Sequence, residues 1–141
     1  FLLTSCVTHY QDVESSEDHA SITFTKSYSR GYSYGESTSM VEYYVYPDNN
    51  CKKPERAAFF SWMTGEDKTR LIAASKPFMV HATLDDFTAS SYNESLRETC
   101  ATVITFTPEK DSEYTISMSG EGNNCFLDVS DNSTNAPPLD I

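Results

Sequence analysis

The sequence predicts an all-β protein, an antiparallel β-sandwich of about seven or eight strands with an immunoglobulin-like or transthyretin-like arrangement. Apolar and β-branched residues alternate with polar ones in several short segments, which is typical of strands with one buried face. Pro, Gly, Asn and Asp separate these segments at short intervals. The length of 141 residues suits one domain that can bury a core of its own.

The first half of the chain contains expected strands at residues 20–28, 40–46, 57–63 and 69–74. Residues 40–46 show the clearest pattern, because Val41, Tyr43 and Val45 share one face and the polar residues share the other. The apolar segment 57–63 is expected to be a central strand, with Trp62 as a candidate core anchor.

The second half contains expected strands at residues 77–84, 99–107, 113–119 and 124–130. The polar stretch 85–98 between the first two is expected to be a long irregular connection that includes about one helical turn. The last three strands are expected to form an up-and-down meander, closed by the glycine-rich turn Gly120-Glu121-Gly122-Asn123.

Charge and cysteine spacing restrict the function. The formal net charge is -11, and such an acidic surface repels nucleic acid and anionic headgroups. The four cysteines are far apart in sequence, whereas zinc ligands usually come in closely spaced pairs. In an oxidising compartment these cysteines are therefore expected to form disulfides.

The favoured bridge joins Cys100 to Cys125, and Cys6 with Cys51 is an alternative second pair. In one flat sheet a strand would separate Cys100 from Cys125 by roughly 9–10 Å. This exceeds the ~7 Å that a disulfide spans between Cα atoms. The bridge therefore requires the last strand to bend or to pass to the opposing sheet.

Candidate binding residues lie in the Ser-, Gly- and Tyr-rich stretch 29–39 and just before it. Tyr28, Tyr32 and Tyr34 form a candidate contact surface, although a loop packed on the sheet is the favoured alternative. His81 is expected on the outer face of its strand, and Asp85-Asp86 lacks the spacing of a calcium loop. We predict no catalytic residue, no metal site and no cofactor.

The segment Leu3-Thr4-Ser5-Cys6 resembles the end of a bacterial lipoprotein signal peptide, in which an aliphatic and two small residues precede a Cys. The resemblance implies that Cys6 is the first mature residue and carries lipid. Two or more acyl chains anchor a protein stably, because each buried methylene contributes roughly 0.8 kcal/mol. Residue 7 is Val, where an Asp would resemble an inner-membrane retention signal.

The region from about Tyr43 to Asp131 also resembles small, mostly uncharacterised bacterial envelope lipoproteins. The matching features are Cys51, Lys76-Pro77-Phe78, Cys100, Phe106-Thr107-Pro108, Tyr114 and Cys125. The chain departs from that pattern in the turn at 108–112, which has no Gly. The resemblance is architectural and implies no activity.

These observations predict a signal-peptide remnant at 1–5, a tether at 6–19, a β-sandwich domain at 20–131 and a tail at 132–141. The expected function is that of a lipid-anchored, non-catalytic envelope protein whose partner is another envelope protein or a glycan. The expected location is the bacterial outer membrane. The alternatives are a secreted disulfide-bonded ligand-binding domain and a small hydrolase; Asn93 and Asn132 are formal glycosylation acceptors that fit secretion.

Overall fold

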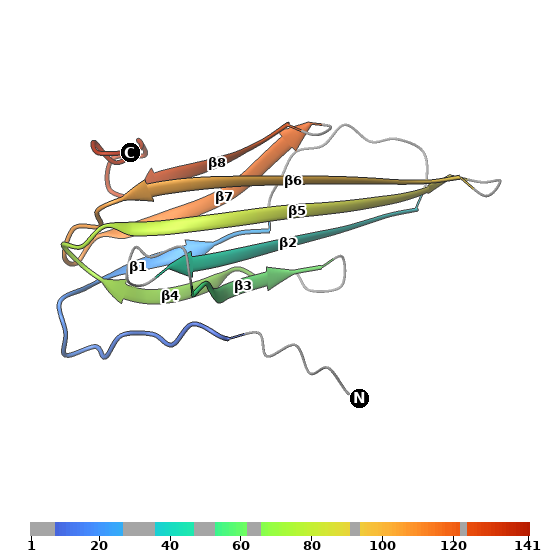
Figure 1. Ribbon diagram of the computed structural model, residues 1–141. Helices are drawn as coiled ribbons and strands as arrows, with labels where there is room; N and C mark the ends of the chain where they lie inside the picture. Colours follow the sequence, from blue (N-terminus) through green and yellow to red (C-terminus); the bar gives the residue numbers. More distant parts are fainter. Residues whose placement is uncertain (1–7, 27–35, 47–52, 62–65, 91–93, 122–123) are drawn as a thin grey trace, which may run out of the picture.

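The computed structural model describes residues 8–26, 36–46, 53–61, 66–90, 94–121 and 124–141, and these form an all-β structure (Figure 1). The strands are β1 (His19–Phe24), β2 (Glu36–Tyr46), β3 (Glu55–Phe60), β4 (Lys68–Ala73), β5 (Phe78–Ser90), β6 (Glu94–Phe106), β7 (Glu113–Glu121) and β8 (Asn124–Asp131). They build two four-stranded sheets, in the orders β4-β1-β7-β8 and β3-β2-β5-β6. The prediction of a β-sandwich with about eight strands is confirmed.

The strand order decides between the two predicted arrangements. In the immunoglobulin arrangement the first strand shares a sheet with the second strand, whereas here β1 and β2 lie in opposite sheets. All pairs are antiparallel except β1 with β7, which run parallel. The order therefore differs from the immunoglobulin-like alternative and leaves the transthyretin-like one.

The core lies between the sheets and consists of the inward residues of the alternating strands. The predicted inward faces are confirmed for Val41, Tyr43 and Val45 in β2 and for alternate residues of the neighbouring strands, namely Ala20, Ile22, Phe24, Phe78, Val80, Ala82, Leu84, Tyr114, Ile116 and Met118. The ring of Tyr43 packs against Phe24 at 5.0 Å and against Phe60 at 6.1 Å between centroids. Its hydroxyl donates a hydrogen bond of 2.9 Å to the carbonyl of Thr25, so this buried polar atom is satisfied.

One predicted strand occupies a different position in the sheet from the one expected. The segment 57–63 was expected to be a central strand, but β3 lies at the edge of its sheet, next to β2 in the described strand order. Its apolar residues fit an edge because they point both ways: Phe60 is buried, whereas Phe59 is 39% exposed on the outer face. Trp62 lies outside the described residues.

The expected irregular connection at 85–98 is wrong. β5 and β6 continue through this stretch, paired residue by residue up to Ser90 with Glu94. Backbone pairing does not need apolar side chains, so the polar composition did not reveal the second half of β5 and the first half of β6. Together with the first residues of β2, these halves extend beyond the opposing sheet (Figure 1).

The expected meander of the last three strands is also wrong in part. β7 and β8 form a tight hairpin, with Glu121 opposite Asn124, but β6 lies in the other sheet. This placement brings Cys100 of β6 next to Cys125 of β8, with 6.0 Å between Cα atoms, and the predicted disulfide is confirmed. The bond therefore links the two sheets along one open side of the sandwich.

The C-terminal segment is folded back onto the domain. The amide of Asp131 donates to the carbonyl of Ala136, and the amide of Thr107 donates to the carboxylate of Asp140. Two hydrogen bonds from Ser133 lower the pKa of the Asp131 carboxyl, because they stabilise its ionised form.

Replacing both Cys100 and Cys125 by Ala will lower the free energy of unfolding by about 3 kcal/mol, because the bridge closes a loop in the unfolded chain. The measurement is a urea titration followed by far-UV circular dichroism. Wild-type protein in reductant is the control and should approach the variant. A midpoint unchanged by either treatment would show that the bridge contributes nothing to stability.

Candidate functional site

Several residues proposed from the sequence lie outside the described part of the chain. These are Cys6, Cys51, Tyr28, Tyr32 and Tyr34. The candidate tyrosine surface and the lipidation site therefore stay predictions. The site described below comes from the part of the chain that the structure places.

The outer face of the β3-β2-β5-β6 sheet carries a row of aromatic and charged residues. The register places Tyr44 of β2 between Arg56 of β3 and His81 of β5. In the next row, Glu42 stands opposite Phe59. We call these five residues the Tyr44 cluster. The outward position predicted for His81 is confirmed, since it faces away from the buried Val80 and Ala82.

Specific contacts order the Tyr44 cluster. The hydroxyl of Tyr44 donates a hydrogen bond to the carboxylate of Glu42, which also forms an ion pair of 3.7 Å with Arg56. The Arg56 guanidinium lies 5.4 Å from the centroid of the Phe59 ring, a cation–π geometry. The rings of Tyr44 and His81 are 6.3 Å apart. The cluster thus presents oriented aromatic rings and polar atoms on a flat sheet surface.

The environment of Tyr44 keeps its hydroxyl protonated. Desolvation is the main cause, and the carboxylate of Glu42 adds to it, so that the pKa of Tyr44 is raised to about 12. At neutral pH the phenol is therefore a hydrogen-bond donor.

A shallow hollow of about 490 Å³ lies beside the Tyr44 cluster on the same sheet. It is lined by Glu42, Thr83, Leu84, Asp85, Thr99, Cys100 and Ala101. Two carboxylates and two hydroxyls at its lining can accept hydrogen bonds from the hydroxyl or amide donors of a ligand. The hollow and the cluster share Glu42, so they form one continuous surface.

Among the described residues, the histidine and the acid considered as lining a catalytic cleft, His81 and Asp85, do not lie next to each other. His81 and Asp85 are four residues apart on one strand, which separates their Cα atoms by roughly 13 Å. The side chain of Asp86 lies outside what the structure describes. Within the described ranges, no group of three or more His, Cys, Asp or Glu residues could hold a metal ion.

A second feature, which the sequence did not predict, lies on the open side of the sandwich formed by β3 and β4. Residues 8–13, here called the strap, run along this side (Figure 1). On β3, Arg56 donates from its amide to the carbonyl of Thr8 at 2.8 Å and accepts from the amide of Tyr10 at 3.0 Å. On β4, the carbonyl of Leu71 accepts from the amide of Val13 at 3.2 Å.

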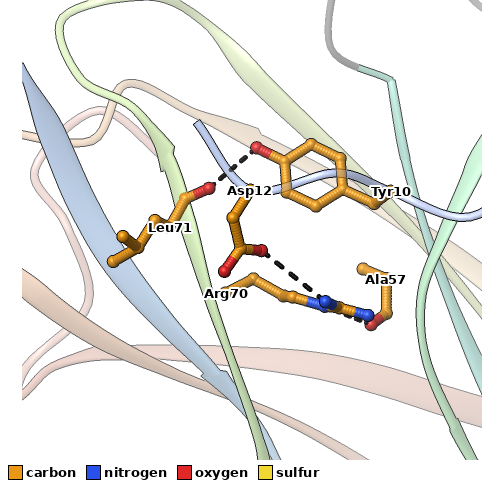
Figure 2. Close-up of polar contacts among 5 residues, drawn as sticks. All are labelled: Tyr10, Asp12, Ala57, Arg70 and Leu71. Carbon is orange, nitrogen blue, oxygen red and sulfur yellow. Dashed lines mark hydrogen bonds and ion pairs between the residues drawn. The ribbon is translucent and has the colours of Figure 1, made fainter. Parts of the chain in front are cut away.

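Side chains fix the strap in place (Figure 2). Tyr10 is only 6% exposed, and its hydroxyl donates to the carbonyl of Leu71 at 2.9 Å. Arg70 holds Asp12 in an ion pair of 3.6 Å and donates to the carbonyl of Ala57 at 2.9 Å. The described part of the expected tether is therefore bound to both sheets over residues 8–13. Residues 8–13 are thus attached to the sheets, although the domain was expected to start at 20.

Comparisons with known proteins assign no family: no protein family, curated protein or solved structure matches this chain. The described residues contain no helix that is long and apolar enough to cross a membrane. The disulfide between Cys100 and Cys125 indicates an oxidising, extracytoplasmic environment.

Replacing Tyr10 by Phe will destabilise the protein by about 1 kcal/mol at pH 8, because the hydrogen bond from the Tyr10 hydroxyl to the carbonyl of Leu71 is lost, while the one from the amide of Val13 remains. The deficit should shrink at alkaline pH. Burial, followed by the charges of Asp12 and Glu55, raises the pKa of Tyr10 to about 12. Its stabilising contribution is complete below the unfolded pKa of about 10. The contribution is lost as the pH rises to about 12.

Urea midpoints of wild type and Tyr10→Phe between pH 8 and pH 12 measure this effect. Tyr43 and Tyr44, whose pKa values are also raised, are present in both proteins and cancel in the comparison. A difference that stays constant across this range would show that Tyr10 ionisation is not linked to folding.

Proposed function

We propose that this protein is a lipid-anchored, non-catalytic interaction module of the bacterial cell envelope, held at the outer membrane through Cys6. Its partner is another envelope protein or a glycan. The observation that supports a binding role is the Tyr44 cluster on the outer face of the β3-β2-β5-β6 sheet. The extracytoplasmic disulfide and the lipoprotein-like segment at 3–6 support the location.

The composition of the outer face suits recognition better than simple solvation. Tyr and Arg are enriched at binding energy hot spots, because they combine apolar area with directional hydrogen bonds. Here Tyr44 and Arg56 stand in neighbouring register positions, with Phe59 in the next row. The 52% exposed Val103 of β6 stands opposite His81 in the same row as Tyr44. Their mutual contacts reduce the entropy that binding would cost.

One observation supports the secreted alternative. The main chain at Thr8 and Tyr10 is hydrogen-bonded to Arg56. Cys6 precedes Thr8 by only two residues, and Cys51 precedes Arg56 by only five. The connecting chain is thus long enough for a Cys6–Cys51 bridge, which would replace the lipid and make the protein a secreted disulfide-bonded binding domain.

The intact mass of the protein from its own cells, with and without reductant, separates these proposals. We expect a mass that starts at Cys6 with added acyl chains, and a Cys6→Ser variant that leaves the membrane fraction. A protein that retains residues 1–5 and gains four hydrogens on reduction, two for each of two bridges, would refute the lipid anchor.

Variants of the Tyr44 cluster test the binding surface. The probes are detergent extract of the envelope and its purified glycan fraction, each passed over immobilised domain. Tyr44→Ala and His81→Ala should each lower retention of the bound component by roughly tenfold, which corresponds to about 1.4 kcal/mol. Glu113→Ala, exposed on β7 of the other sheet, is the matched control and should bind like wild type. Equal retention by all variants would exclude this face.

A further inference from the structure

The two open sides of this sandwich are closed in different ways. Cys100 and Cys125 join β6 to β8 on one side. The strap joins β3 to β4 on the other through main-chain hydrogen bonds to Arg56 and Leu71. Figure 1 shows the strap beside β3 and β4 and β8 on the opposite side of the molecule. The chain therefore enters the domain on the side that is farthest from the disulfide.

The number of residues between Cys6 and the strap limits how far apart the two can lie. Thr8 is already hydrogen-bonded to β3, and it follows Cys6 by two residues. Two residues of extended chain span at most about 7 Å. A free segment from Cys6 to His19 would instead allow a reach of more than about 40 Å over thirteen residues.

We propose that the strap orients the domain on the membrane, so that the open side formed by β3 and β4 lies against the lipid surface. This inference rests on the proposed lipid anchor at Cys6. The β6–β8 side and the disulfide then point away from the bilayer. The strap holds the domain rigidly in this orientation. The outer face with the Tyr44 cluster is then roughly perpendicular to the membrane and accessible to partners in the envelope.

The charges near the strap indicate that the lipid anchor, and not attraction to lipid headgroups, would hold the side formed by β3 and β4 at the bilayer. Exposed carboxylates lie in and after the strap at Asp12, Glu14, Glu17 and Asp18. On the nearby strands, Arg70 is paired with Asp12 and Arg56 with Glu42. The exposed Lys53 and Lys68 also lie near this side, but the four carboxylates outnumber them. Attraction to anionic headgroups therefore does not hold this side at the bilayer, and the covalent anchor with its short connection must do so. The orientation should therefore form on zwitterionic vesicles.

The test uses acylated protein in phosphatidylcholine vesicles that carry a nitroxide on the lipid headgroup. A fluorescent amino acid replaces either Lys68 of β4 or Asp128 of β8, both exposed and at opposite edges of one sheet. Three strand spacings, roughly 14 Å, separate these edges, so quenching at position 68 should exceed that at position 128 by about twofold or more.

Release of the strap provides the decisive comparison. The double variant Tyr10→Ala with Asp12→Ala removes both side-chain attachments of the strap. In this variant the two positions should be quenched almost equally. Glu14→Ala is the matched control. Glu14 is exposed next to the strap, and its side chain is not one of those that attach the strap to β3 and β4. This control variant should keep the wild-type difference.

The outcomes separate the two proposals. Hydrogen exchange should show protected amides at Tyr10 and Val13 in wild type and unprotected ones in the double variant, which tests the strap without the lipid. Equal quenching at both positions in acylated wild type would overturn the orientation alone, and so would a difference that survives strap release. A mass without acyl chains on Cys6 would overturn both the anchor and the orientation.

Discussion

The contact between the inner faces of the two sheets is the interaction on which this structure depends. Tyr43 lies at its centre, packed between Phe24 of the opposing sheet and Phe60 of its own. Its hydroxyl must find a partner because it is buried, and the carbonyl of Thr25 supplies one. Burial of this face fixes the register of every strand that contributes to it, since a shift by one residue would expose its apolar side chains.

That same constraint explains what could be predicted from the sequence. Strands with one buried face carry a period-two pattern, so β7 and the core-facing part of β2 were predicted with their inward residues, whereas the first four residues of β2, 36–39, were expected in a loop. The stretch 85–98 extends past the opposing sheet, and without a core to cover it needs no apolar alternation. Its strands were therefore missed. The assignment of β6 and β7 to different sheets depends on contacts distant in sequence, which a local pattern does not record.

The strap and the Tyr44 cluster were hidden for related reasons. Tyr10 is one aromatic residue in a polar segment, and its hydroxyl bonds to Leu71, 61 residues away. The alternating face that includes Glu42 and Tyr44 was recognisable in β2, but its partners Arg56 and His81 come from β3 and β5. Only the strand order makes them neighbours. A functional surface assembled across strands cannot be found by examining one strand at a time.

The closed construction of the domain limits where a partner can bind. The inner faces are occupied by core side chains, the disulfide closes one open side, and the strap closes the other. Of the described surface, the outer faces of the sheets and the parts of β2, β5 and β6 beyond the opposing sheet remain. The outer face that includes Tyr44 has interacting aromatic and charged groups beside a hollow. Because Glu42 is shared between Tyr44, Arg56 and the hollow, a ligand that approached its carboxylate would also contact the ordered aromatic rings. Recognition there would need little rearrangement of the sheet, which suits the rigid, lipid-anchored module that we propose.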